Sequence, residues 1–269
     1  MTGYSVQALP LEKRALRTKP IKYLFLIVVI AQFAVPALPA LGFGETIGDR
    51  AVADGIPPEL PLGVFFSIWS VIFFGLLAIA ILNLFAPDAA SKRLVPPLTC
   101  AVIGNCLWML CAQSVGSTWL DFLLILPIAV FTWEAAYRQD RTGRYDGTPR
   151  SILYGLTVGL FAGWLTVATS ISFPDLGRWL LGRGPSDAVW QSLWMTVIPA
   201  AIMATVFASY ISRNGWYFVA LGWGLLGVIL NNWLRLETHG LAIAATVITL
   251  YIIFRRVRFG ARGSYPAKL

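Results

Sequence analysis

The chain has 269 residues, of which 57% are hydrophobic and only 13% are charged, and its mean hydropathy is +0.70. Because a soluble domain carries roughly 25% charged residues, this composition excludes a protein whose surface faces water and predicts that lipid surrounds most of the chain. The net charge of +8 does not indicate nucleic-acid binding. The basic residues lie in gaps between apolar segments, so no soluble basic face is left to form.

Eight apolar segments approach the length of about 20 residues that crosses a bilayer as a helix. In chain order they are 22–42, 62–86, 95–114, 119–137, 151–173, 190–212, 216–233 and 240–254. Each is expected to be helical, because backbone amides inside a bilayer must find their partners within the protein. The sequence therefore predicts an all-α fold, a polytopic transmembrane helix bundle of about eight spans. Pro36, Pro39, Pro127 and Pro199 lie inside the segments and are expected to kink helices rather than end them.

Basic residues give the predicted orientation. With the N-terminus in the cytoplasm, 17 of the 21 lysines and arginines fall on the cytoplasmic side, and the outer side keeps Arg50, Arg178, Arg183 and Arg235. This bias predicts a multi-pass protein of the cell membrane with both termini cytoplasmic. In a bacterium the helical spans favour the inner membrane, because outer-membrane proteins are mostly barrels. A cleaved signal peptide is the rival interpretation of the first segment, since a basic start and an apolar stretch precede the small-residue run at 36–42.

Glycines in the fifth segment form a tandem GxxxG pattern of Gly155, Gly159 and Gly163. Such a pattern lets a second helix approach closely. The helix that packs against this glycine face is either another helix of the same chain or the same helix of a second copy in a homodimer.

Residues that carry chemistry are scarce. The chain has one histidine, His239, and no nucleophile–base constellation, so we expect neither a catalytic nor a metal site and no required cofactor. Asp121 and Glu134 lie near the two ends of the fourth segment. Because both can reach the interface, they are interpreted as solvated or locally paired.

Tryptophan is the most informative residue type. Trp69, Trp108 and Trp164 lie inside three different segments, all roughly 10–14 Å below the outer boundary at 1.5 Å per residue. At helical spacing Phe65 and Phe73 share the face of Trp69, and Asn105 precedes Trp108 by one turn. Aromatic faces with one amide among them suit a flat, mostly apolar ligand. Ordinary packing of a helix bundle explains the same pattern.

Three of these stretches resemble one family. Residues 61–73, PLGVFFSIWSVIF, resemble the second-helix signature P-x-W-x-F-G-P-V-W-T-x-L-Y of the tryptophan-rich sensory protein (TspO/MBR) family, also called the translocator protein or peripheral-type benzodiazepine receptor family. Residues 105–108, NCLW, resemble its third-helix N-x-x-W-S. Residues 163–172, GWLTVATSIS, resemble its fifth-helix W-x-x-F-A-x-x-L-N, with Ser172 in place of the asparagine. The fragments occur in family order and cover about residues 20–175.

The resemblance implies a five-helix core at 22–175, preceded by a cytoplasmic tail at 1–21. A three-helix extension at 176–254 and a basic cytoplasmic tail at 255–269 would follow it. It also implies a pocket for tetrapyrroles such as porphyrins or for sterol-like lipids, closed by a lid between Gly42 and Leu60. The residues that the resemblance implies would line, brace or extend the pocket are Phe65, Trp69, Phe73, Asn105, Trp108 and Trp164.

The expected function is therefore binding, sensing or transport of a hydrophobic planar molecule, with membrane lipid and that ligand as partners and no nucleic acid. Two alternatives belong to other classes. One is a structural or assembly subunit of a larger membrane complex, which would pack through glycine-rich helices. The other is a small-solute transporter, in which Asp121 or Glu134 would have functional roles.

Overall fold

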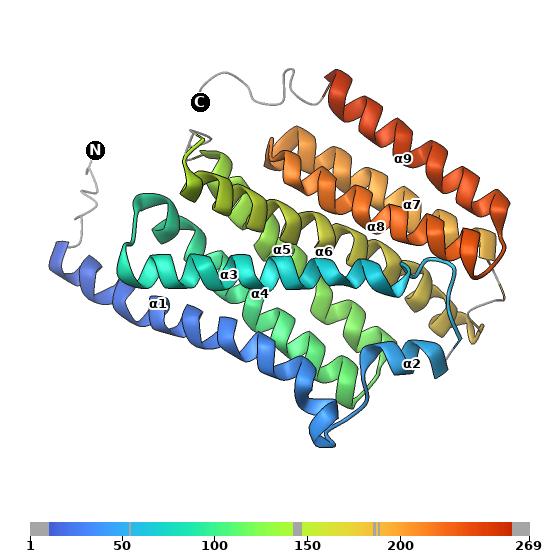
Figure 1. The fold of residues 1–269 in the computed structure, drawn as a ribbon, viewed down its shortest axis with the longest axis horizontal. Coiled ribbons are helices and arrows are strands. Elements are labelled where there is room, and N and C mark those ends of the chain that lie inside the picture. Colours follow the sequence, from blue (N-terminus) through green and yellow to red (C-terminus); the bar gives the residue numbers. More distant parts are fainter. Residues whose placement is uncertain (1–10, 54, 142–146, 185–186, 188, 260–269) are drawn as a thin grey trace, which may run out of the picture.

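The computed structural model describes residues 11–53, 55–141, 147–184, 187 and 189–259, and within these ranges every regular element is a helix (Figure 1). The first half of the chain forms α1 (Leu11–Ala34), the 3-10 helix η1 (Val35–Leu41), α2 (Ile47–Ala53), the 3-10 helix η2 (Gly63–Ser67), α3 (Ile68–Phe85), α4 (Ala89–Ser114) and α5 (Thr118–Arg141). The second half forms α6 (Pro149–Leu181), α7 (Val189–Val206), the π-helical turn η3 (Phe207–Ile211), α8 (Gly215–Leu234) and α9 (His239–Phe259).

Seven of the helical stretches in the described part of the chain are long and apolar enough to cross a membrane. The eighth, α9, has a shorter apolar stretch from His239 to Phe254. The predicted all-α fold of about eight spans is thus confirmed. The chain is a multi-pass membrane protein.

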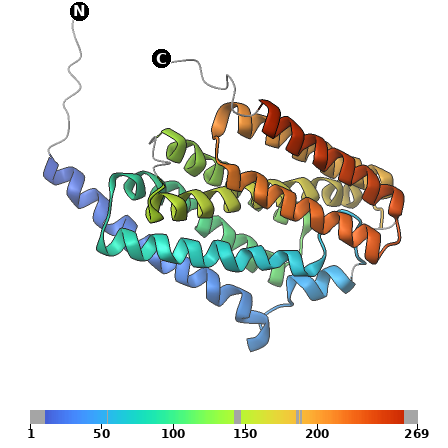
Figure 2. The same cartoon turned by 45° about the horizontal axis from the view of Figure 1, so that its top comes forward.

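Successive long helices run in alternating directions through the bundle, as Figures 1 and 2 show together. The start of α1 and the end of α9 consequently lie at the same end, which we call the terminal end. The short helix α2 lies at the opposite end, which we call the α2 end (Figure 1). The segment between η1 and η2, residues 42–62, crosses this end.

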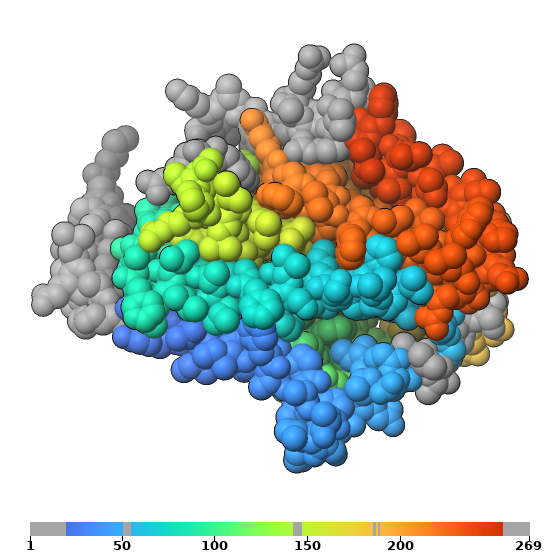
Figure 3. Space-filling view, in the orientation of Figure 1, coloured from blue at the N-terminus to red at the C-terminus, as the bar shows by residue number. Residues whose placement is uncertain are grey.

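Helix α6 is the central element of the bundle. It packs against α3, α5, α7 and α8. Of its most apolar stretch of 18 residues, 83% is buried inside the protein. The space-filling view shows the first part of α6 above α3, with the rest behind α3 and the C-terminal helices, and a hollow between α1, α2 and α3 (Figure 3). Thr148 caps the start of α6 through its side chain, and Gly182 ends the helix in the left-handed conformation, φ 63°.

The tandem glycines of α6 face α8. A Cβ built on Gly159 would lie 2.6 Å from Oδ1 of Asn214, and one built on Gly163 would overlap the carbonyl oxygen of Tyr217. The absent side chains therefore let α8 approach α6 within the same chain. The glycine face is occupied, so a homodimer, which stays a prediction, would have to use another surface.

Several helix ends differ from the predicted segments. Helix α1 begins at Leu11 and gives way to η1 at Val35, directly before Pro36. Pro36 therefore ends the α-helical part instead of only kinking it, because proline lacks a donor and clashes with the preceding turn. Pro127 and Pro199 do remain inside helices, as expected. Helix α6 runs to Leu181, so no helix end marks the predicted boundary at 175.

Candidate ligand-binding site

A cavity of about 250 Å³ lies inside the bundle near the α2 end. Helices α3, α4, α5 and α6 form its walls, and α2 with residues 55–60 closes it from the α2 end. Four of the six residues singled out in the sequence line it together: Trp69, Asn105, Trp108 and Trp164.

Aromatic rings form the deep, apolar part of the cavity. Trp164 is 1% exposed, and its ring meets that of Trp69 edge to face, with centroids 6.3 Å apart and planes at 82°. The ring of Phe66 meets Trp164 in the same manner at 5.4 Å. Edge-to-face contacts fix ring orientations, so the wall is a preformed surface rather than a loose cluster.

Phe65 and Phe73 do not line the cavity. Phe65 packs against Trp223 of α8, with centroids 4.6 Å apart. Phe73 lies beside Trp69, at 5.4 Å, on the side facing α1. The expectation that Phe65 shares a face with Trp69 is wrong because residues 63–67 form a 3-10 helix, in which residues three apart share a face. Phe66, which sequence reasoning missed, takes that place.

Asn105 brings an unpaired amide to the cavity wall. Its side chain is 1% exposed, and neither Oδ1 nor Nδ2 has a hydrogen-bond partner among the described residues. Burying such a group without partners costs about 1–3 kcal/mol. A buried, unpaired amide on a cavity wall is a group available to a ligand.

Charged residues surround the α2 end of the cavity. The guanidinium group of Arg178, 6% exposed, donates to Glu59, to Asp175 at 3.4 Å and to Oγ of Ser192 at 2.8 Å. Glu59 is 2% exposed, and burial raises the pKa of its carboxyl group, while the hydrogen bond from Arg178 acts in the opposite direction. This buried ion pair joins the 42–62 segment to the end of α6.

Arg50 of α2 makes a second connection across this end. Its guanidinium group donates to the backbone carbonyls of Ala112 and Gln113, which lie in the last turn of α4. These carbonyls have no partner within their own helix, and a cation there also interacts favourably with the helix dipole. Arg50 thereby holds α2 over the cavity.

The two acids of α5 have different environments. Glu134 pairs with Arg138 one turn later at 2.6 Å, so the interpretation as a locally paired residue is confirmed for it. Asp121 instead lines the cavity, and its buried Oδ1 has no hydrogen-bond partner in the described part of the chain. Asp121 is half-buried, and the interpretation as solvated or paired does not describe its Oδ1, because the cavity, which no sequence pattern marks, lies beside it.

Helix α8 holds the later part of the 42–62 segment, at residues 57, 58 and 62. Nδ2 of Asn232, 1% exposed, donates to the carbonyl of Pro58 at 2.6 Å, and Nδ2 of Asn231 donates to that of Pro57 at 3.4 Å. The backbone N–H of Leu62 donates to the carbonyl of Gly227 at 3.0 Å. Sequence reasoning assigned no role to the C-terminal helices. In the structure α8 positions residues 57–62, which are part of the segment 42–62 that covers the cavity and that we call its cover.

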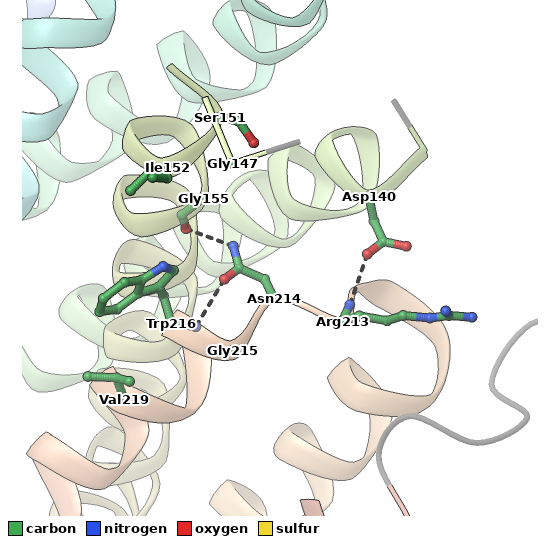
Figure 4. Close-up of a pocket in the computed structure, with 10 residues that line it drawn as sticks. All are labelled: Asp140, Gly147, Ser151, Ile152, Gly155, Arg213, Asn214, Gly215, Trp216 and Val219. Carbon is green, nitrogen blue, oxygen red and sulfur yellow. Dashed lines mark hydrogen bonds between the residues drawn. The ribbon is translucent and has the colours of Figure 1, made fainter. Parts of the chain in front are cut away.

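A second, open cavity of about 860 Å³ lies at the terminal end between α5, α6 and α8 (Figure 4). Asn214 caps α8 there, accepting from the backbone N–H of Trp216 at 3.0 Å and donating to the carbonyl of Gly155 at 2.8 Å. Asp140 accepts from the backbone N–H of Arg213 at 3.0 Å. None of the six predicted site residues lines this cavity.

Comparison with known proteins identifies the family of the chain. No curated protein and no solved structure matches the chain. A sequence model of the TSPO-like protein family matches residues 10–257, which include all of α7 and α8 and nearly all of α9. The chain therefore belongs to the TSPO-like protein family.

Proposed function

We propose that this protein binds a hydrophobic planar molecule in its tryptophan-lined cavity and that binding, not catalysis, is its role. The observation that carries the proposal is the meeting of Trp69, Trp108, Trp164 and Asn105 on the wall of one cavity. Flat apolar surfaces with one unpaired amide suit a planar ligand that carries a hydrogen-bonding group. Binding is the step that a sensor and a transporter share.

Porphyrins and sterol-like lipids are the ligand classes that the family resemblance implies. The cavity volume of about 250 Å³ lies below the range of roughly 300–1,000 Å³ that is usual for ligand sites. A tetrapyrrole therefore requires the 42–62 segment to move outward. Polar contacts of Arg50, Arg178 and Asn232 hold this segment, and such contacts can be exchanged for contacts with water when the segment moves.

The test is titration of protoporphyrin into the detergent-purified protein, followed by quenching of tryptophan fluorescence. The double variant Trp69→Ala, Trp164→Ala removes the deep wall of the cavity. The matched control is Trp190→Ala, Trp194→Ala, because these side chains are 52% and 42% exposed and lie outside the cavity. Saturable quenching in the parent and the control, lost in a folded wall variant, supports the proposal. Absence of saturable quenching in the parent refutes it for this ligand class.

We further propose that the protein lies in the cell membrane, the inner membrane in a bacterium, with both termini in the cytoplasm. Arginines and lysines concentrate at the terminal end, which supports this orientation. Reporter fusions after residue 269 and within 183–187 should report opposite sides of the membrane. The same side for both fusions would refute the proposed topology.

A further inference from the structure

We propose that the α2 end of the cavity binds the protonated nitrogen of a compact, flat aromatic ligand, so that the site, with residues 42–62 in place, selects organic cations over carboxylates of the same outline. A tetrapyrrole, which requires that segment to move, falls outside this selection. The inference rests on the proposed binding function and adds the chemistry of the polar end. It follows from the hydrogen-bonding capacity and the charge of the groups around that end.

Unpaired acceptors outnumber unpaired donors on the buried wall. The buried polar atoms of the lining that lack a partner among the described residues are Oε2 of Glu59, Oδ1 of Asp121, and Oδ1 and Nδ2 of Asn105. All but the last are acceptors. A ligand that satisfies them must bring N–H donors, and an ammonium or amidinium-like nitrogen brings several at one point.

The charges around this end point the same way. Three acids and two bases line the cavity: Glu59, Asp121, Asp175, Arg50 and Arg178. The two guanidinium groups are already engaged, one with Glu59, Asp175 and Ser192 and the other with two backbone carbonyls of α4. The bases therefore offer little to an incoming carboxylate, whereas two acids keep a free oxygen. An anion would meet like charge in a site of low dielectric constant.

The apolar part of the cavity sets the shape of the ligand. Trp69, Trp108 and Trp164 present aromatic surface directly below the acidic end, and indole faces attract cations as well as stacking on flat rings. The volume of about 250 Å³ suits an occupant of a few fused rings when residues 42–62 stay in place. In the described part of the chain no three carboxylate, thiol or imidazole groups converge as metal ligands, so the spread acceptors suit an organic cation.

The experiment compares three tricyclic probes of the same outline: aminoacridine, which is a cation at neutral pH, uncharged anthracene, and acridine carboxylate. Each is titrated into the purified protein in nanodiscs of uncharged lipid, which prevents a surface charge from concentrating one probe. Aminoacridine is expected to bind about tenfold or more tightly than acridine carboxylate, because charged donors meet unpaired acceptors. Anthracene should bind between the two.

The variant Asp121→Asn tests the assignment, because it keeps the size of the side chain and removes its charge. It should reduce the preference for aminoacridine over anthracene by about tenfold. The matched control is Glu237→Gln, an exposed acid in the α8–α9 connection outside the cavity, which should leave that preference unchanged. Glu59→Gln is the second variant and tests the other free carboxylate oxygen in the same way. The free energy of unfolding of the parent is also measured with and without aminoacridine, because a ligand that binds the folded state raises it.

The outcomes separate the two proposals. A parent that binds anthracene but shows equal or reversed preference between the charged probes would overturn the cation site and leave the proposed function intact. An unchanged preference in a folded Asp121→Asn protein would also overturn it. Saturable binding of none of the probes would overturn the proposed function itself, since the tryptophan wall would then bind no flat ring.

Discussion

Removal of the buried guanidinium group by Arg178→Met provides the most direct test of how the cavity is closed. Arg178 is 6% exposed and its main partner Glu59 is 2% exposed, so neither charge can turn to water. The substitution keeps the length of the side chain and deletes the donors to Glu59, Asp175 and Ser192. Glu59 would remain inside the protein with an uncompensated charge.

Breaking a buried ion pair from one side costs about 3–5 kcal/mol. Replacing both members with apolar residues of similar size is often neutral or stabilising. The double variant Arg178→Met, Glu59→Leu should therefore recover most of the loss. Arg183→Met is the matched control, because Arg183 is exposed two residues after α6 ends. That change should stay within about 0.5 kcal/mol.

The pH dependence of Arg178→Met has a definite sign. Burial already raises the pKa of Glu59 in the parent, and loss of the arginine removes the main opposing influence. The folded state then binds the proton more tightly than the unfolded chain, whose pKa is near the usual 4.5. The variant should be relatively more stable at low pH and lose stability as the pH rises from about that value through the raised folded pKa.

Equilibrium unfolding by sodium dodecyl sulfate in mixed micelles, followed by far-ultraviolet circular dichroism, measures all of these free energies. The reasoning would be refuted by an Arg178→Met loss below about 1 kcal/mol, the size of an exposed pair. A double variant no more stable than the single one would contradict it as well, because the cost would then not come from the stranded carboxylate.

Two further changes test the helix contacts around the site. Gly163→Val places a branched side chain against a backbone carbonyl of α8, and the overpacking should cost about 1–3 kcal/mol in the same unfolding assay. The control is Gly222→Val, because nothing lies within 4 Å of a Cβ added at Gly222. It should lower the free energy of unfolding clearly less than Gly163→Val, and equal losses would argue against the α6–α8 contact. Asn232→Ala removes the donor to the carbonyl of Pro58. It should lower the free energy of unfolding by about 1–3 kcal/mol and speed amide hydrogen exchange at residues 59, 60 and 62. Unchanged exchange there would show that α8 does not hold the segment.

The spans and the tryptophan wall could be predicted because their signals are local. Apolar length marks a span whatever it packs against. Trp69 lies one residue into α3 and Trp108 six residues before the end of α4, and Trp164 meets them on the cavity wall although α6 continues 17 residues beyond it. The position of Phe65 could not be predicted in the same way. A short 3-10 helix precedes α3, and the change from 3.6 to 3.0 residues per turn rotates that ring toward α8.

The closure of the cavity has no local signal. Glu59 and Arg178 are 119 residues apart in the chain, and Asn232 and Pro58 are 174 apart. Each of these polar residues is ordinary in its own stretch, and only the fold brings them together. An acid or amide near the end of a span is equally compatible with a solvated side chain and with a buried, paired one. Sequence reasoning therefore located the aromatic wall and missed the charged end of the cavity.

Helix α8, which lies beyond the five-helix core predicted at 22–175, contacts both that core and the residues that close the cavity. It covers the glycine face of α6, the helix that carries Trp164, and it also contacts η2 through Gly227, where an added Cβ would lie 2.8 Å from Phe65. Its end holds Pro58 through Asn232. A truncated chain would expose the glycine face and free the cover of the cavity at once. The C-terminal helices are thus part of the structure around the cavity, and the family match likewise runs to residue 257.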